Sequence, residues 1–148
     1  NDESVWELSS TQTPYSKFLI KQYLENAHKD IYEVKQLRLV VSSYSNEPLG
    51  MIDIFDFDFK NRRAGVGILI KDVKNRDRGY GREALQLLIN YSFTHLGLHQ
   101  LYCNISEDNK ASIKLFENQG FVNVGLKKDW NYSNGSYSNE FLFQLIND

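Results

Sequence analysis

The stretch Arg76–Ala84 reads RDRGYGREA and places two glycines, Gly79 and Gly81, at the start of an amphipathic segment. Backbone N–H groups at such a helix start converge on an anion, and the helix dipole favours negative charge there. Basic residues surround the glycines: Lys71, Lys74, Arg76, Arg78 and Arg82. The stretch therefore fits a pyrophosphate group, although a solvated loop with a glycine turn is the alternative for so short a motif.

Gly79, Gly81 and Ala84 also satisfy the G-x-G-x-x-G/A fingerprint of dinucleotide-binding folds. That fingerprint requires a tight turn immediately after a parallel strand, whereas the largely charged loop 71–78 intervenes here. The chain also contains no GxxxxGK[ST] motif. A nicotinamide or flavin site is therefore not expected, and a P-loop nucleotide site is excluded.

Hydrophobic spacing predicts a mixed α/β chain on both sides of this stretch. Upstream, it predicts a helix over 14–28 and an antiparallel meander of three strands, over 36–42, 49–57 and 64–70. Downstream, it predicts a helix that begins after Gly81 and ends near Gly97, a strand over 100–105 and a helix over 109–118. A hairpin of strands 121–126 and 137–146 follows, and Asn134-Gly135 is its turn signal.

Composition indicates one domain of 148 residues that is 41% hydrophobic and 24% charged. The net charge of −2 argues against a nucleic-acid partner, and no apolar run approaches the roughly 18 residues of a membrane span. The single Cys103 excludes a disulfide framework, and His28, His95 and His99 show no metal spacing. We therefore expect a cytoplasmic protein without a bound metal.

Two motifs together resemble the GCN5-related N-acetyltransferase (GNAT) family. Arg76-x-x-Gly79-x-Gly81 is followed, one helix and one strand later, by Asn109-x-x-Ser112-x-x-Leu115-Phe116-x-x-x-Gly120-Phe121. The segment 87–100 and the turn at Asn134 are similar to the subfamily of spermidine and ribosomal-protein N-terminal acetyltransferases. The resemblance is firmest from Pro48 onward. It implies that Asn1 lies inside the family's first helix and that the leading strand precedes the chain.

The resemblance implies an acyl-CoA N-acyltransferase fold, with a mostly antiparallel sheet splayed at the cofactor site and flanked by helices. It also implies acetyl-CoA as cofactor, gripped at its pyrophosphate by the backbone of 76–81. The pantetheine arm would lie beside the strand 68–70, and Asn109 and Ser112 match the positions that orient the other side of the cofactor. The implied cofactor-binding residues are Ile68, Leu69, Ile70, Arg76, Arg78, Gly79, Tyr80, Gly81, Arg82, Asn109, Ser112 and Phe116.

The chain departs from the family at two positions. Many members carry a tyrosine, whose hydroxyl protonates the departing thiolate, where this chain has Phe116. A glutamate that often lies near the amine is replaced by Gly65. Tyr132 and Tyr137 are candidates to supply the missing hydroxyl. The simpler interpretation is that both are aromatic residues on the surface. Cys103 lies in an apolar strand without a basic neighbour, which favours a buried filler over a nucleophile.

Acidic groups near the amine would then come from the second meander strand, where Asp53 and Asp56 match carboxylate positions of the polyamine enzymes. Regular alternation puts these two side chains on opposite faces, so that only one shares a face with Ile54 and Asp58. The alternative is the polar face of a hairpin, balanced by Lys60, Arg62 and Arg63. Because a carboxylate of pKa about 4 is a poor base for an ammonium, we expect a binding role.

The expected reaction is direct attack of a primary amine on the thioester, with a small amine or polyamine as acceptor. The segment with Ser16, Lys17 and Ile20 lacks the acidic cluster that forms a regulatory site in the polyamine enzymes. Two alternatives remain open: a protein or peptide N-terminal acetyltransferase, and a non-catalytic acyl-CoA-binding module, given Phe116 and Gly65. The surplus of aromatic residues and the resemblance also lead us to expect a homo-oligomer.

Overall fold

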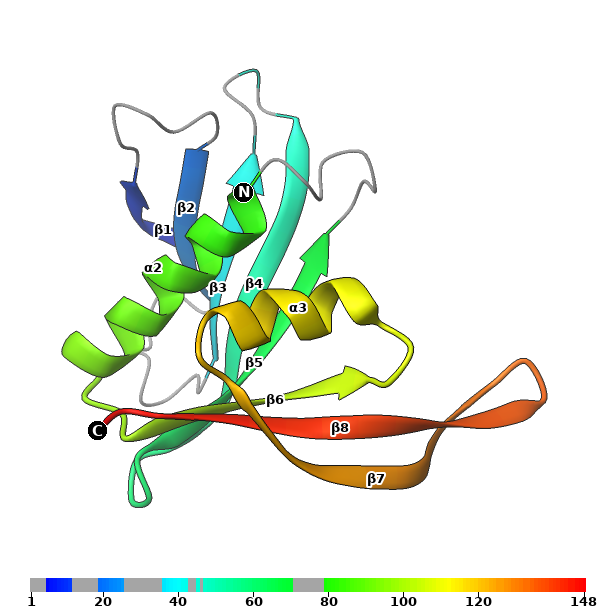
Figure 1. Cartoon of the computed structure of the whole chain (residues 1–148). Coiled ribbons are helices and arrows are strands. Elements are labelled where there is room, and N and C mark those ends of the chain that lie inside the picture. The colour runs from blue at the N-terminus through cyan, green and yellow to red at the C-terminus, as the bar shows by residue number, and fades with distance from the viewer. Residues whose placement is uncertain (1–4, 12–18, 26–35, 43–44, 46, 71–78) are drawn as a thin grey trace.

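The computed structural model describes residues 5–11, 19–25, 36–42, 45, 47–70 and 79–148. Its eight strands form one sheet, with the strand order β1-β2-β3-β4-β5-β6-β8-β7 (Figure 1). The elements are β1 (Val5–Thr11), β2 (Leu19–Glu25), β3 (Gln36–Ser42), β4 (Pro48–Asp58), β5 (Arg63–Ile70), α2 (Tyr80–Thr94), β6 (Gln100–Ser106), α3 (Lys110–Asn118), β7 (Val122–Ser133) and β8 (Ser136–Ile146). The predicted mixed α/β class is confirmed.

The strands pair antiparallel everywhere in the described sheet except between β5 and β6. The meander of β3, β4 and β5 follows the sequence prediction, with pairs such as Leu39↔Ile52 and Ile54↔Val66. The parallel ladder covers only three residue pairs and ends at Gly65↔Tyr102. Beyond that pair the two strands separate, so the sheet is splayed at its centre.

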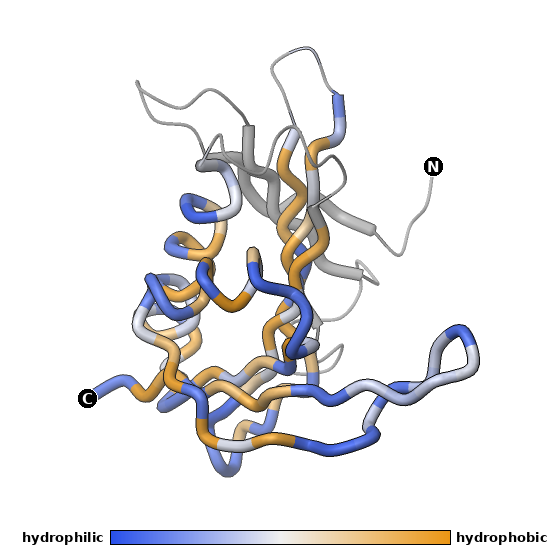
Figure 2. Tube along the Cα trace, turned by 45° about the vertical axis from the view of Figure 1, so that its right-hand side comes forward, coloured by the Kyte–Doolittle hydropathy of each residue, from blue (hydrophilic) through white to orange (hydrophobic). Residues whose placement is uncertain are grey.

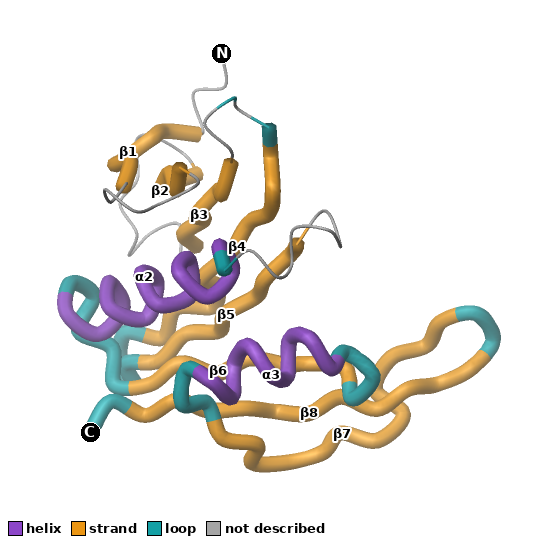
Figure 3. Tube along the Cα trace, turned by 45° about the horizontal axis from the view of Figure 1, so that its top comes forward, coloured by secondary structure: helices purple, strands orange, loops and turns teal. Residues whose placement is uncertain are grey.

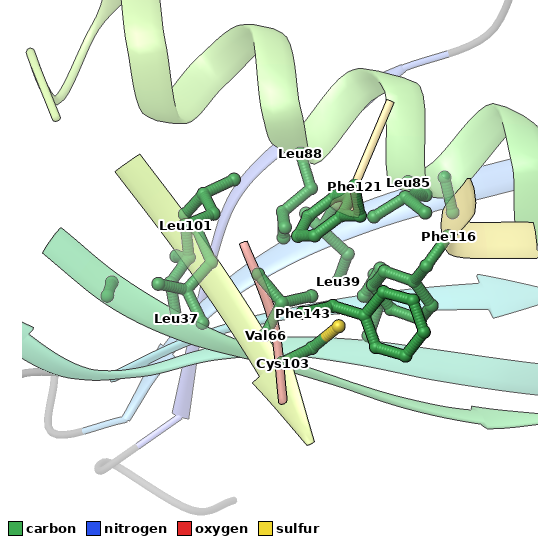
Figure 4. Close-up of a cluster of buried hydrophobic side chains, with 14 of the residues drawn as sticks. Leu37, Leu39, Val66, Leu85, Leu88, Leu101, Cys103, Phe116, Phe121 and Phe143 are labelled. Atoms are coloured by element: carbon green, nitrogen blue, oxygen red, sulfur yellow. The ribbon is translucent and has the colours of Figure 1, made fainter. Parts of the chain in front are cut away.

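The hydrophobic core lies on one face of the sheet, beneath α2 and α3 (Figures 1 and 3). Leu85 and Leu88 of α2 and Phe116 of α3 pack there against Leu101 and Phe143 of the neighbouring strands (Figure 4). The alternation of β6 is strict, because residues 101, 103 and 105 are buried while those between them are not. The other face of β6 therefore carries the more polar side chains.

The hairpin of β7 and β8 extends past the rest of the sheet, and its tip is hydrophilic (Figures 1 and 2). Asn134 and Gly135 both have positive φ, 52° and 81°, as a type I′ turn requires. The predicted turn is confirmed. Strand β7 is longer than predicted, because pairing continues up to Ser133↔Ser136 at the turn itself.

The helix predicted over residues 14–28 is wrong in its described part, where β2 runs over Leu19–Glu25. This strand pairs with β1 on one side and with β3 on the other. Apolar residues in so short a segment fit a helical period and an alternating one almost equally well. Pairing with two neighbouring strands then outweighs the local preference.

A β-bulge interrupts β4 between Phe55 and Asp58, where the register with β5 shifts. Asp56 has a φ of 53° and is exposed, while Phe57 is buried. The extra residue reverses the alternation, because Ile54 points into the core before the bulge and Phe57 points into it afterwards. The predicted placement of Asp53 and Asp56 on opposite faces of a regular strand is therefore wrong.

Candidate functional site

The separation of β5 from β6 opens a cleft of about 90 Å³. Its walls are the two strands, and its floor is one face of α3. The lining residues are Val66, Gly67, Ile68, Cys103, Asn104, Ile105, Ser106, Asn109, Ser112 and Phe116. Four predicted cofactor-binding residues, Ile68, Asn109, Ser112 and Phe116, are therefore brought together in one place. Asn104 and Ser106 were missed, because only the observed end of the β5–β6 ladder exposes them to a cleft.

The glycine-rich N-terminus of α2 lies at one end of β4 and β5. Gly79 is the N-cap residue, with a φ of 85° that favours glycine, and its carbonyl accepts from the N–H of Glu83 at 3.0 Å. The Tyr80 hydroxyl donates to the Leu49 carbonyl of β4 at 3.0 Å and is buried. Tyr80 thus anchors the helix, whose glycine-rich N-terminus is of the type that binds anions.

The structure describes only some of the remaining predicted cofactor-binding residues. Arg82 is exposed on the first turn of α2, and Leu69 is exposed on β5. Arg76 and Arg78 lie outside the described residues, as does the side chain of Ile70. Their roles remain predictions.

One face of α3 lines the cleft at helical spacing. Asn109 is the N-cap residue, and its side-chain oxygen accepts from the N–H of Ser112 at 3.1 Å. Phe116 is buried and meets Phe121 edge to face at 5.0 Å between ring centres. The position expected for a hydroxyl donor is therefore filled by an apolar ring.

Cys103 faces the core side of β6 and is buried beside Phe116 (Figure 4). Burial raises the pKa of its thiol to about 12. A thiol of that pKa is neutral near pH 7 and is a weak nucleophile. This agrees with the interpretation of Cys103 as packing.

The aspartates of β4 have three different environments. Asp53 accepts a hydrogen bond and ion pair from Arg38 Nε at 2.8 Å across to β3. Hydrogen bonds from the Asn61 side chain and N–H lower the pKa of Asp58, and Arg63 adds to this effect. Asp56 makes no salt bridge to any described residue and is exposed on the bulge. The two predicted residues, Asp53 and Asp56, are therefore not equivalent.

An aromatic ring fills the place where the family's glutamate would project. Phe55 lies over Gly65, and a Cβ atom built on that glycine would be 2.5 Å from Phe55 Cε2. Phe55 also meets Tyr102 edge to face at 6.5 Å. Burial raises the pKa of Tyr102, and the negative charge of Asp56 adds to this effect. Phe55 and Tyr102 thus form an aromatic surface on the face opposite the helices.

Several other candidates lie away from the cleft. Tyr132 and Tyr137 pair across the end of the hairpin and are largely exposed. His95 stacks on Tyr91, and His99 borders an open depression of about 610 Å³ that contains none of the predicted site residues. Within the described ranges, no cluster of His, Cys, Asp and Glu is placed to hold a metal ion. No helix there is long and apolar enough to cross a bilayer.

The family described as "Acetyltransferase (GNAT) domain" matches residues 1–122 of this chain. The chain belongs to the GNAT acetyltransferases. This membership makes it an acetyl-CoA-dependent N-acetyltransferase, and the expected fold class is confirmed with it.

Among curated relatives of this GNAT chain is the spermidine N(1)-acetyltransferase of Vibrio cholerae, 28% identical over 126 residues, which are 85% of this chain and 71% of the relative. The Escherichia coli enzyme of the same name is 27% identical over 86% of this chain and 67% of its own. A solved structure of the Vibrio cholerae enzyme with CoA and spermine has a TM-score of 0.71 at 25% identity, over 78% of this chain and 68% of that one. Another structure of that enzyme is described as dodecameric.

The packing of Phe55 on Gly65 generates a stability prediction. Gly65→Ala should lower the free energy of unfolding by about 1–3 kcal/mol, because the new methyl group displaces the ring. In a Phe55→Ala background the same substitution should lower the free energy of unfolding by markedly less. Urea unfolding of the four proteins in this double-mutant cycle measures the coupling.

Gly125→Ala is the matched control, since a Cβ there meets nothing within 4 Å. It should change the free energy of unfolding by about 0.5 kcal/mol or less. Additive effects of the Gly65 and Phe55 substitutions would contradict the close contact.

Proposed function

We propose that this chain transfers the acetyl group of acetyl-CoA directly to a primary amine, with a small amine or polyamine as acceptor. The observation that carries the proposal is the cleft between β5 and β6. Its lining residue Ile68 also lines a pocket with Tyr80 and Gly81 at the N-terminus of α2. The CoA bound to the similar Vibrio cholerae enzyme supports acetyl-CoA as the cosubstrate here.

The residues present fit acetyl-CoA in chemical character. The first turn of α2 offers backbone N–H groups and the exposed Arg82 to a pyrophosphate. The edge of β5 beyond Gly65 is not paired with β6, so its backbone can hydrogen-bond an amide-rich arm as a neighbouring strand would. Asn109 and Ser112 offer polar groups on the floor of the cleft.

In the proposed reaction the amine nitrogen forms a bond to the thioester carbonyl carbon, and the carbon–sulfur bond breaks. The sulfur keeps the electron pair and leaves as a thiolate, since Phe116 supplies no proton. The attacking nitrogen gives its surplus proton to water as the amide forms. A thiol pKa of about 8.5 makes that departure feasible near neutral pH. The acceptor ammonium must first lose a proton to water, because the carboxylates nearby are weak bases and serve to bind it.

The acceptor class rests on charge and on the relatives. Asp56 presents an exposed carboxylate on the face opposite the helices, close enough to Tyr102 to affect its pKa. The curated relatives carry the name of spermidine acetyltransferases, which supports a cationic amine. A peptide N-terminus is the second candidate, because the Phe55 and Tyr102 surface would also accept an apolar side chain. A module that binds CoA without turnover is the third candidate, because Phe116 lacks a hydroxyl group that could protonate the thiolate.

Self-association forms part of the proposal. Strand β7 is an edge strand of the sheet and exposes Val122, Val124 and Leu126. An exposed edge with apolar side chains is typical of a surface that another chain covers. The dodecamer described for the Vibrio cholerae relative supports a homo-oligomer here.

Gly79→Val should raise the Kd for acetyl-CoA at least about tenfold, because a β-branched residue is strained at a φ of 85° and disturbs the N–H groups of α2. Isothermal titration calorimetry measures the effect. Gly135→Val is the matched control, since Gly135 has a φ of 81° in the remote hairpin turn and should leave the Kd unchanged. Equal affinities of wild type and Gly79→Val would reject the proposed pyrophosphate site.

Thiol release from acetyl-CoA tests the reaction itself. We expect release to depend on an added amine, with spermidine and putrescine giving higher kcat/KM than amino sugars or peptides with a free N-terminus. A preference for the peptides would support the N-terminal acetyltransferase alternative. Calorimetric binding of acetyl-CoA with no release for any amine would support the non-catalytic module instead.

Asp56→Asn should raise the KM for spermidine by about two- to fivefold, the size typical of an exposed charge pair, without changing the KM for acetyl-CoA. Asparagine tolerates the positive φ at this position, so folding should be preserved. Glu117→Gln on the exposed surface of α3 is the control with the same change in charge. An unchanged KM for spermidine would remove Asp56 from the acceptor site.

A further inference from the structure

The ammonium group of Lys127 on β7 is held by three groups of different chemistry. Its Nζ atom donates to Asn104 Oδ1 at 2.7 Å and pairs with Glu140 Oε1 at 2.9 Å. The same atom lies 4.6 Å from the centre of the Trp130 ring. A carboxylate, an amide oxygen and an indole face are the groups that recognise a primary ammonium ion. We call Asn104, Glu140 and Trp130 the ammonium cage.

The cage depends on a distortion of the hairpin. In a regular strand Lys127 and Trp130 would point to opposite faces, because their numbers differ by three. The register between β7 and β8 shifts between Lys127 and Asn131, and Asp129 within that shift has a φ of 51°. The N–H of Asp129 donates to Asn139 Oδ1 at 2.9 Å. The bulge thereby brings the indole ring over the ammonium group.

The carboxylate of the cage is fixed and partly withdrawn from solvent. The side chain of Glu140 is 16% exposed, and that of Lys127 is 25% exposed. The second oxygen of Glu140 accepts from Asn131 Nδ2 at 3.2 Å. Glu140 therefore stays in position when its first oxygen changes partner, and its attraction for a cation is stronger than that of a fully exposed carboxylate.

The cage lies at the rim of the acetyl-transfer cleft. Asn104 belongs both to the cage and to the cleft lining. On the same face of β6, two residues earlier, stands Tyr102 of the aromatic surface. Glu140 pairs with Ser106, another residue of the cleft lining. A cation in the cage would thus lie next to the opening on the side opposite the helices.

We propose that Asn104, Glu140 and Trp130 form a binding site for a primary ammonium group of the acceptor, and that Lys127 fills this site until the acceptor displaces it. The role in acetyl transfer rests on the proposed function, whereas ammonium binding by the cage does not. Lys127 competes as a tethered ligand, so removing its charge strengthens binding of an external ammonium ion.

The test titrates n-butylamine, a cation at pH 7, into proteins carrying Trp6→Phe, so that Trp130 is their only tryptophan. We expect Lys127→Met to bind n-butylammonium at least about tenfold more tightly than the parent, as seen by Trp130 fluorescence. Lys127→Met retains the aliphatic stem and so limits the effect on folding. Adding Glu140→Gln should abolish the gain. Lys128→Met, on the exposed neighbour, should match the parent.

Equal binding by the Lys127→Met and Lys128→Met proteins would overturn the proposal, and so would an equal response to uncharged n-butanol. In turnover assays, Glu140→Gln should raise the KM for spermidine about tenfold, and Lys127→Met should lower it, with the KM for acetyl-CoA unchanged in both. An unchanged KM for spermidine in Glu140→Gln would overturn the role of the cage. If no amine is acetylated at all, the proposed function fails, while the fluorescence titration still decides whether the cage binds an ammonium ion.

Discussion

The parallel pairing of β5 with β6 stops after three residue pairs, and the rest of the site depends on that stop. Each strand keeps a long antiparallel ladder on its other side, β5 with β4 and β6 with β8. The separation therefore loses few backbone hydrogen bonds, and the two helices cover the core beneath it. A continuous ladder would close the cleft and join its two walls.

Two bulges then decide what faces the cleft from the side opposite the helices. The bulge in β4 turns Phe57 into the core and leaves Asp56 exposed. The bulge in β7 brings Trp130 over Lys127. The first lies in the strand next to β5, and the second lies in β7, which β8 separates from β6. Irregular pairing therefore aims side chains without disturbing β5 or β6 themselves.

The sequence predicted the elements that carry strong local signals. The glycine-rich start of α2, the short helix α3 and the Asn134-Gly135 turn each depend on residues close together in the sequence, and all three are observed. The strand β2 was mistaken for a helix, because its pairing with β1 and β3 is nonlocal. The ammonium cage was not predicted either. Its members come from three strands, and regular alternation would have separated Lys127 from Trp130.

The carboxylates around the cleft are mostly neutralised within the fold, Asp53 by Arg38 and Glu140 by Lys127. An unpaired, partly buried carboxylate is unfavourable, and an internal cation keeps it ionised and oriented. The site is therefore selective for a ligand that can take the place of the Lys127 ammonium group. A neutral molecule cannot replace Lys127 at Glu140, whereas an ammonium group can do so at little net change in charge.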